Sequence, residues 1–141
     1  MCTNILIGQF ITESSASGKS CTYKPPSSGY NDKTFRSPEE YAHVDQTAAT
    51  DVYALGSLFY YILTGKRAWE GMTGKKERKE ANAWVVEGKK PHISSKLLKS
   101  HDPVDIALLK AYEMSTVYKP EKRATARQVS DYLDGVWKEL S

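Results

Sequence analysis

The stretch Thr50–Gly65, with the sequence TDVYALGSLFYYILTG, decides the fold of this chain. The threonine hydroxyl can cap the N-terminus of a helix, and Gly65 can follow its last residue in a left-handed conformation. Apolar side chains occupy almost every side of the predicted helix, Asp51–Leu63. Such a helix is normally buried in the middle of a domain. The sequence therefore predicts a mainly α domain built around one central buried helix.

Capping signals predict further helices on both sides of the central one. Ser37-Pro38-Glu39-Glu40 offers a capping hydroxyl, a proline at the first helical position and a glutamate for a capping box. Asp102-Pro103 starts a later helix, and Thr125-Ala126-Arg127-Gln128 forms a second capping box. In the two C-terminal helices, apolar residues recur at helical spacing. They are Val104, Leu108, Ala111 and Tyr112 in the first and Val129, Tyr132, Leu133, Val136, Trp137 and Leu140 in the second.

A more exposed helix is predicted over Lys75–Glu87, with Trp84 and Val85 as its apolar anchor and Gly88 as its stop. Its basic cluster, Lys75–Lys79, is interrupted by an acid, which is typical of a solvated helix face. The formal net charge of the whole chain is only +3. A domain that follows the phosphates of a nucleic acid usually concentrates its basic residues on one face. We therefore expect no nucleic acid partner.

Residues 1–34 differ in composition from the helical part. Ile5-Leu6-Ile7 predicts a short apolar strand, and Glu13–Asp32, rich in Ser, Gly, Lys and Pro, predicts a long loop. Within this loop, Gly18-Lys19-Ser20 matches the end of a phosphate-binding P-loop. Glu13, however, stands where that loop needs its first glycine. The sequence therefore predicts no nucleotide site there.

The size and composition are those of one ordinary globular domain. The chain has 141 residues, of which 40% are apolar and 26% are charged. Its two cysteines, Cys2 and Cys21, make neither a disulfide framework nor a metal-ligand set, so we expect reduced thiols in a cytoplasmic or nuclear protein. The apolar stretch Ile5–Ile11 is too short to span a membrane and lacks the basic flank of a signal peptide. We expect no membrane partner.

Four segments, in their order along the chain, resemble motifs of eukaryotic-type protein kinases, nearer the Ser/Thr group. Phe35–Glu40 is similar to the Ser/Ala-Pro-Glu motif, and Asp51–Gly56 is similar to the start of the central helix of the C-terminal lobe. Ile62–Lys66 is similar to the usual end of that helix. Pro120–Thr125 is similar to the Pro-x-x-Arg-x-Thr/Ser segment before the last helix.

The resemblance covers residues 30–140 and implies a truncated kinase-like fold. Residues 35–141 would form the helical subdomain of the kinase C-lobe. Residues 1–34 would be a strand remnant and a loop similar to the activation segment. The N-lobe and the catalytic loop of the family have no counterpart in the sequence.

The resemblance implies structural roles for four residues. Glu39 and Arg123 look like the family's internal ion pair, which ties the end of the activation segment to the helical subdomain. A bidentate contact between arginine and carboxylate suits this role because it fixes orientation. Without the resemblance, both residues are ordinary surface charges. Asp51 resembles the aspartate that accepts backbone N–H groups from the catalytic loop, or is simply an acid favoured by the helix dipole. Gly56 ends the same motif.

No catalytic, cofactor-binding or metal-binding residue is expected in this chain. Phosphoryl transfer in the family needs a Gly-rich loop, a strand lysine, a catalytic-loop Asp and Asn, and the metal-binding Asp of Asp-Phe-Gly. The sequence contains neither Gly-x-Gly-x-x-Gly nor His-Arg-Asp. By the resemblance, ATP and magnesium would be cofactors of full-length relatives and not of this chain. The chain belongs to the Ser/Thr protein kinases by resemblance only, and whether it is an enzyme stays open.

Three hypotheses of function follow. The first is a partial Ser/Thr protein kinase domain that is catalytically inactive alone, although its full-length relatives transfer the ATP γ-phosphate to protein hydroxyls. The second is a non-catalytic, pseudokinase-like interaction module that docks a protein through the helix Lys75–Glu87, with Trp84 and Val85 as contact residues. The third is an incomplete gene product, whose central helix exposes apolar surface because upstream helices are absent.

Overall fold

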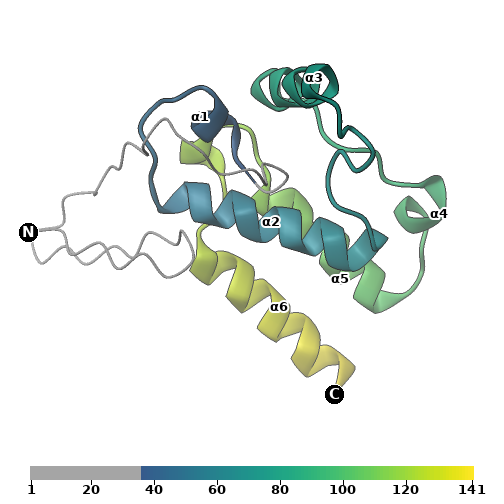
Figure 1. The fold of residues 1–141 in the computed structure, drawn as a ribbon. Coiled ribbons are helices and arrows are strands. Elements are labelled where there is room, and N and C mark those ends of the chain that lie inside the picture. Colours follow the sequence, from purple (N-terminus) through teal and green to yellow (C-terminus); the bar gives the residue numbers. More distant parts are fainter. Residues whose placement is uncertain (1–35) are drawn as a thin grey trace, which may run out of the picture.

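The structure is a computed structural model and describes residues 36–141. This part of the chain is mainly helical and contains no β-strand, which confirms the predicted mainly α class. The elements are α1 Pro38–Tyr41, α2 Ala48–Thr64, α3 Lys75–Val86, α4 Ser95–Leu98, α5 Pro103–Ser115, the 3-10 helix η1 Pro120–Lys122 and α6 Ala126–Leu140 (Figure 1). The strand predicted at Ile5-Leu6-Ile7 and the loop predicted over Glu13–Asp32 lie outside the described residues.

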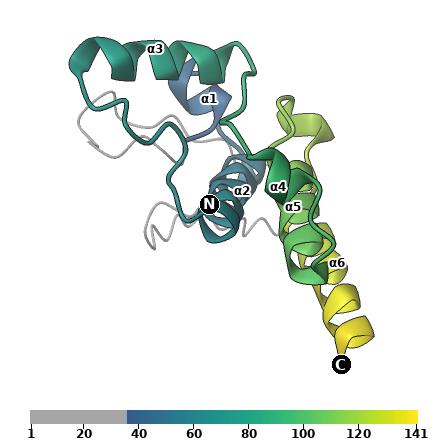
Figure 2. The ribbon, with the colours of Figure 1, turned by 90° about the vertical axis from the view of Figure 1, so that its right-hand side faces the viewer.

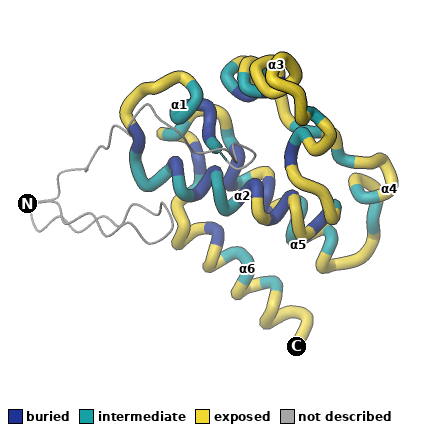
Figure 3. Tube along the Cα trace, in the orientation of Figure 1, coloured by how far each residue is buried: buried dark blue, intermediate teal, exposed yellow. Residues whose placement is uncertain are grey.

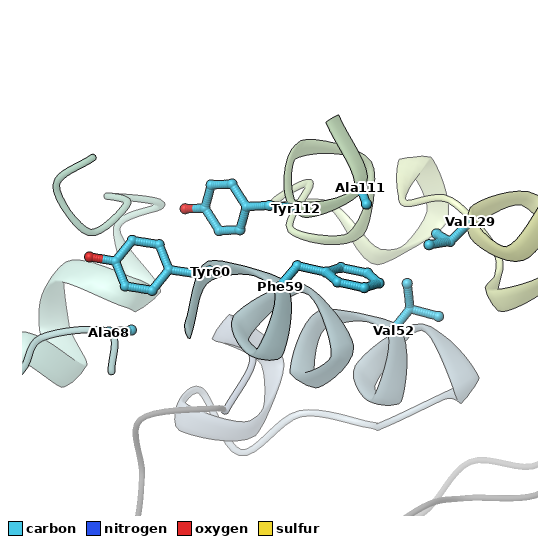
Figure 4. Close-up of a cluster of buried hydrophobic side chains, with 7 residues drawn as sticks. All are labelled: Val52, Phe59, Tyr60, Ala68, Ala111, Tyr112 and Val129. Atoms are coloured by element: carbon cyan, nitrogen blue, oxygen red, sulfur yellow. The ribbon is translucent and has the colours of Figure 1, made fainter. Parts of the chain in front are cut away.

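Helices α2 and α5 pack along one another and form the centre of the domain (Figure 1). Helix α6 packs against α5, while α3 lies at the opposite side, next to the short α1 (Figure 2). The core fills the space between these elements, and Phe59 of α2 reaches toward α5 and α6 there (Figure 4). Its buried members are Val52, Phe59, Tyr60, Ala68, Ala111, Tyr112 and Val129.

The central helix begins one turn earlier than predicted. Thr47, not Thr50, is its N-cap: the Thr47 hydroxyl accepts a hydrogen bond from the backbone N–H of Ala49 at 3.3 Å. Thr50 lies inside the first turn, where its own hydroxyl accepts from the Thr47 N–H at 3.3 Å and so completes a capping box. At the other end, Gly65 adopts the predicted left-handed conformation, with φ 71°. A hydroxyl at either position can cap a helix, and the sequence alone favoured the wrong one.

The prediction that α2 is a buried central helix holds for only one of its sides. Leu58, Tyr61 and Ile62 are 43%, 43% and 56% exposed. By their helical spacing they lie on one side of α2, opposite the buried Val52, Phe59 and Leu63, and Figure 3 shows exposed segments along this helix. The part of the chain that the structure describes therefore supplies only enough neighbours to bury the opposite side. This exposed apolar stripe of three residues is called the α2 face below.

The two C-terminal helices bury less of their apolar faces than their spacing predicted. Val104 at the start of α5 is 54% exposed, whereas Ala107, Ala111 and Tyr112 are buried. In α6, Val129 is buried but Trp137 is 73% exposed. Figure 1 shows the reason, because the C-terminal half of α6 runs beyond the other helices. The periodicity identified both helices correctly but could not show where their neighbours end.

A glycine allows α2 and the end of α5 to cross closely. A Cβ atom added at Gly56 would lie 2.5 Å from Thr116 Cγ2 and 2.8 Å from Ser115 Cβ. Both neighbours are buried, and the contact is shorter than any side chain tolerates. Gly56 is therefore required by packing, and its backbone does not need a left-handed conformation.

We expect Gly56→Ala to lower the free energy of unfolding by about 1–3 kcal/mol, because the added methyl group overpacks this crossing. Urea denaturation of the variant measures the effect. Gly135→Ala is the matched control, since Gly135 is also helical but a Cβ there meets nothing within 4 Å. It should raise the free energy of unfolding by about 0.5–1 kcal/mol through helix propensity. Equal effects at the two positions would contradict the close crossing.

Candidate functional site

A buried ion pair joins the N-terminal end of the described chain to the segment before its last helix. Arg123 Nη1 lies 2.7 Å from Glu39 Oε1, and Arg123 Nη2 lies 3.2 Å from Glu39 Oε2. The two residues are 84 positions apart in sequence and only 6% and 5% exposed. Two parallel N–H···O bonds of this kind fix the guanidinium and the carboxylate in one plane. The structure thus contains the pair that the resemblance implied.

The remaining donors of the arginine are used as well. Arg123 Nε donates to the carbonyl of Val117 at 2.8 Å, Nη1 to that of Ala49 at 2.6 Å, and Nη2 to that of Tyr118 at 3.1 Å. One face of the guanidinium lies 5.0 Å from the centre of the Tyr53 ring, a cation–π contact. A buried charge is tolerated when its hydrogen-bonding groups are satisfied in this way. The arginine has no donor left to offer a substrate.

The carboxylate is held by α1 and by the first turn of α2. Ser37 caps α1 in a reciprocal box, in which its N–H donates to Glu40 Oε2 at 2.7 Å. This fixes the helix turn that carries Glu39. Thr50 then donates from its hydroxyl to Glu39 Oε1 at 3.2 Å. Burial raises the pKa of the neighbouring Glu40 above its ordinary value, although its bonds to Ser37 act in the opposite direction.

Asp51 and Gly56 lie further along the same helix. Asp51 is in the first turn of α2 and is half-buried, a position where the helix dipole favours an acid. Gly56 lies between the two helices, as described above. Both residues belong to one helix, which accounts for their place in one motif.

Two contacts of the pair were not predicted from the sequence. Thr50 bonds to Glu39, and the Tyr53 ring lies against Arg123. Thr50 and Tyr53 lie three positions apart on α2 and therefore on the same side of the helix. That spacing, taken together with the proposed pair, is the signal that could have identified them. Burial raises the pKa of Tyr53 to about 12, against a smaller lowering effect of the nearby Arg123 charge.

Trp84 and Val85 anchor α3 to the domain. Val85 is 5% exposed, and the ring of Trp84 lies 5.3 Å from that of Trp69, tilted by 51°. Both residues thus serve as the apolar anchor that the sequence predicted. The further prediction that both contact a protein partner is not met by Val85, because a buried side chain is not accessible for docking.

Among residues 36–141, no group of three or more His, Cys, Asp or Glu side chains is placed to hold a metal ion. Cys2 and Cys21 lie outside these residues. Within the same range, no helix has both the length and the hydropathy that crossing a bilayer requires. The chemistry of the arrangement around Arg123 is that of a structural tie, because its N–H groups bond to a carboxylate and to three backbone carbonyls.

Comparison with known proteins gives no further assignment: no protein-family model matches the chain, and no curated protein is significantly similar to it in sequence.

We expect Arg123→Ala to lower the free energy of unfolding by about 3–5 kcal/mol, because Glu39 would stay buried without a counter-charge. A lower melting temperature and lower solubility should follow, measured by calorimetry and by the soluble fraction after expression. Arg127→Ala is the control, since Arg127 is an exposed arginine four residues later. Its effect should remain within about 0.5 kcal/mol. A wild-type melting curve for Arg123→Ala would refute the pair's role.

We also expect stability to fall steeply above pH 10. Burial raises the pKa of Tyr53 to about 12 and raises that of Tyr112 as well, whereas an unfolded tyrosine titrates near 10. Between these values the unfolded chain loses protons that the folded chain keeps. The protonated phenols therefore contribute their full stabilisation of the folded chain below pH 10. As pH rises from 10 through the folded pKa, the free energy of unfolding falls by about 1.4 kcal/mol per pH unit for each tyrosine.

Urea denaturation at a series of alkaline pH values, with tyrosinate absorbance as a second signal, measures this slope. Tyr53→Phe should make it shallower, since one of the two titrating groups is removed. A stability that does not change between pH 10 and 12 would show that these phenols ionise in the folded chain as they do in water.

Proposed function

We propose that this chain carries the helical part of a Ser/Thr-type protein kinase domain, from the activation segment to the last helix. Its full-length relatives would transfer the γ-phosphate of ATP to protein Ser or Thr, with Mg²⁺ as the metal. The observation that carries the proposal is the buried fork between Glu39 and Arg123. These two residues come from two separate segments that resemble kinase motifs, and the resemblance implies that they pair.

The uncovered side of α2 supports the same proposal. A central helix that is apolar nearly all round is normally buried on every side. Here the α2 face, Leu58, Tyr61 and Ile62, is exposed. A partial kinase domain accounts for this exposure, because the upstream helices of the family would cover that side of its central helix. Exposure of a stripe this apolar favours aggregation or association with other chains.

We propose further that the 141 residues have no kinase activity alone. The sequence contains no Gly-rich loop, no strand lysine in the family's context and no His-Arg-Asp. Phosphoryl transfer depends almost entirely on positioning and charge stabilisation by those groups. Arg123, the one buried cation among residues 36–141, donates all its N–H groups to the Glu39 carboxylate and to three backbone carbonyls. We place the chain in the cytoplasm or nucleus, on the basis of its cysteine content.

The interaction-module hypothesis has less support. It proposes a protein partner on α3, with Trp84 and Val85 as contacts. Val85 is buried and Trp84 packs on Trp69, so the solvent-facing side of α3 is left to residues such as Lys75, Lys76 and Lys79. A mixed charged surface of this kind is usually solvated.

The purified chain should not turn over ATP in the presence of Mg²⁺ and a generic protein substrate. The expected rate equals that of buffer, because the groups that hold the phosphates and the metal are absent from the sequence. Phosphate release and label transfer measure it. Turnover by the 141-residue chain that disappears in a core variant such as Val52→Asp would contradict the proposal, since contaminating kinases would not respond to that substitution.

Sequencing of the transcript upstream of the Met1 codon provides the positive test. The proposal predicts an open frame that encodes His-Arg-Asp-x-x-x-x-Asn and a Gly-rich loop, and a longer product that phosphorylates Ser or Thr. An upstream frame that encodes an unrelated domain would refute the kinase assignment. That result would not bear on the ion pair, whose contribution to stability is tested separately by Arg123→Ala.

A further inference from the structure

A small cavity lies between the layer formed by α2 and α5 and the elements around α3. Its lining includes Ser57 and Tyr60 of α2, Tyr112 and Thr116 at the end of α5, and Trp69 and Val85. The cavity volume is ≈ 10 Å³, which is near the lower limit for one ordered water. Hydroxyl groups and aromatic rings both contribute to the walls, so the cavity is not purely apolar.

Tyr112, one of the lining residues, has a buried hydroxyl with no hydrogen bond of normal length and angle among residues 36–141, and the residue is only 4% exposed. Burial raises the pKa of Tyr112, and the Thr116 side chain is near enough to act in the opposite direction, but Thr116 Oγ1 already donates to the Tyr112 carbonyl at 2.8 Å and accepts from Lys90 Nζ at 3.2 Å. The nearby Lys90 does not bond to the Tyr112 hydroxyl either, because its Nζ lies 5.3 Å from the centre of the Tyr112 ring and 3.2 Å from Thr116 Oγ1. A buried hydroxyl without a partner is costly, so such groups in native proteins almost always bond to protein or to water.

Tyr60 offers a contrast a short distance away. Its ring centre lies 5.7 Å from that of Tyr112, and its hydroxyl donates to the carbonyl of His92 at 2.9 Å. Figure 4 shows that the hydroxyls of the two rings point in the same direction, away from Phe59. Because the Tyr60 hydroxyl donates its hydrogen to the backbone carbonyl of His92, its oxygen keeps a lone pair that can accept a further hydrogen bond.

We propose that the cavity holds one ordered water molecule, which accepts a hydrogen bond from the Tyr112 hydroxyl and donates one to the Tyr60 oxygen. The water connects α5 to α2 and, through the bond from Tyr60 to His92, to the segment that follows α3. A water with two or more such partners is part of a structure and is costly to remove. This inference does not depend on the kinase proposal.

The paired variants Tyr112→Phe and Tyr60→Phe test the water in solution. With the water in place, Tyr112→Phe removes a satisfied bond and should lower the melting temperature by roughly 3–6 °C. Tyr60→Phe, which loses the direct bond to the His92 carbonyl as well as the bond from the water, should lower it further and shows that the assay detects such a loss. If Tyr112→Phe leaves the melting temperature unchanged or raises it, the hydroxyl is unsatisfied and the proposal is overturned.

A crystal structure of the full chain gives the direct readout, which does not depend on how the variants fold. The expected result is density for one water within hydrogen-bonding distance of the Tyr112 hydroxyl, absent or displaced in Tyr112→Phe. A cavity without density for a water, or a protein group that accepts from the Tyr112 hydroxyl, would each overturn the proposal.

Discussion

The burial of the Arg123 charge is the constraint on which the rest of this structure depends. A guanidinium cannot be deprotonated in a protein, so it must meet acceptors wherever it is placed. Here the acceptors come from α1, from the start of α2 and from the segment after α5. Each segment is held where its acceptor can reach an N–H group of the planar, rigid guanidinium. The position of Arg123 thus determines how the two ends of the described chain approach α2.

The helix pair α2 and α5 supplies the frame for this cluster. Gly56 lets the end of α5 come close to α2, and the chain that leaves α5 then carries the carbonyls of Val117 and Tyr118 to the arginine. The close crossing and the ion pair are therefore related: a larger residue at position 56 would push away the same segment that satisfies Arg123. Packing density in the core and charge satisfaction at its edge cannot be adjusted independently.

Local signals in the sequence predicted local structure well. The caps at Ser37, Asp102 and Thr125 lie where the residues indicated, because a capping hydroxyl or carboxylate needs only its own next turn. The Glu39–Arg123 pair was expected only through a resemblance, since nothing local connects residues so far apart. Thr47 was missed because two threonines competed for one cap. Exposure of Val104 and Trp137 could not be predicted, because periodicity indicates an apolar side and not what covers it. Exposure of apolar surface on α2 was expected only under the hypothesis of an incomplete gene product, and the sequence did not indicate which residues form it.

The separation of 84 residues between Glu39 and Arg123 also determines the order in which the two partners are synthesised. During synthesis at about 5–20 residues per second, Glu39 emerges roughly 4–17 s before Arg123. For that interval the carboxylate has no counter-charge, and its burial would be unfavourable. Helix α1 can therefore take the place that it has in this structure only after the segment that carries Arg123 has been made, although α1 comes first among the described helices.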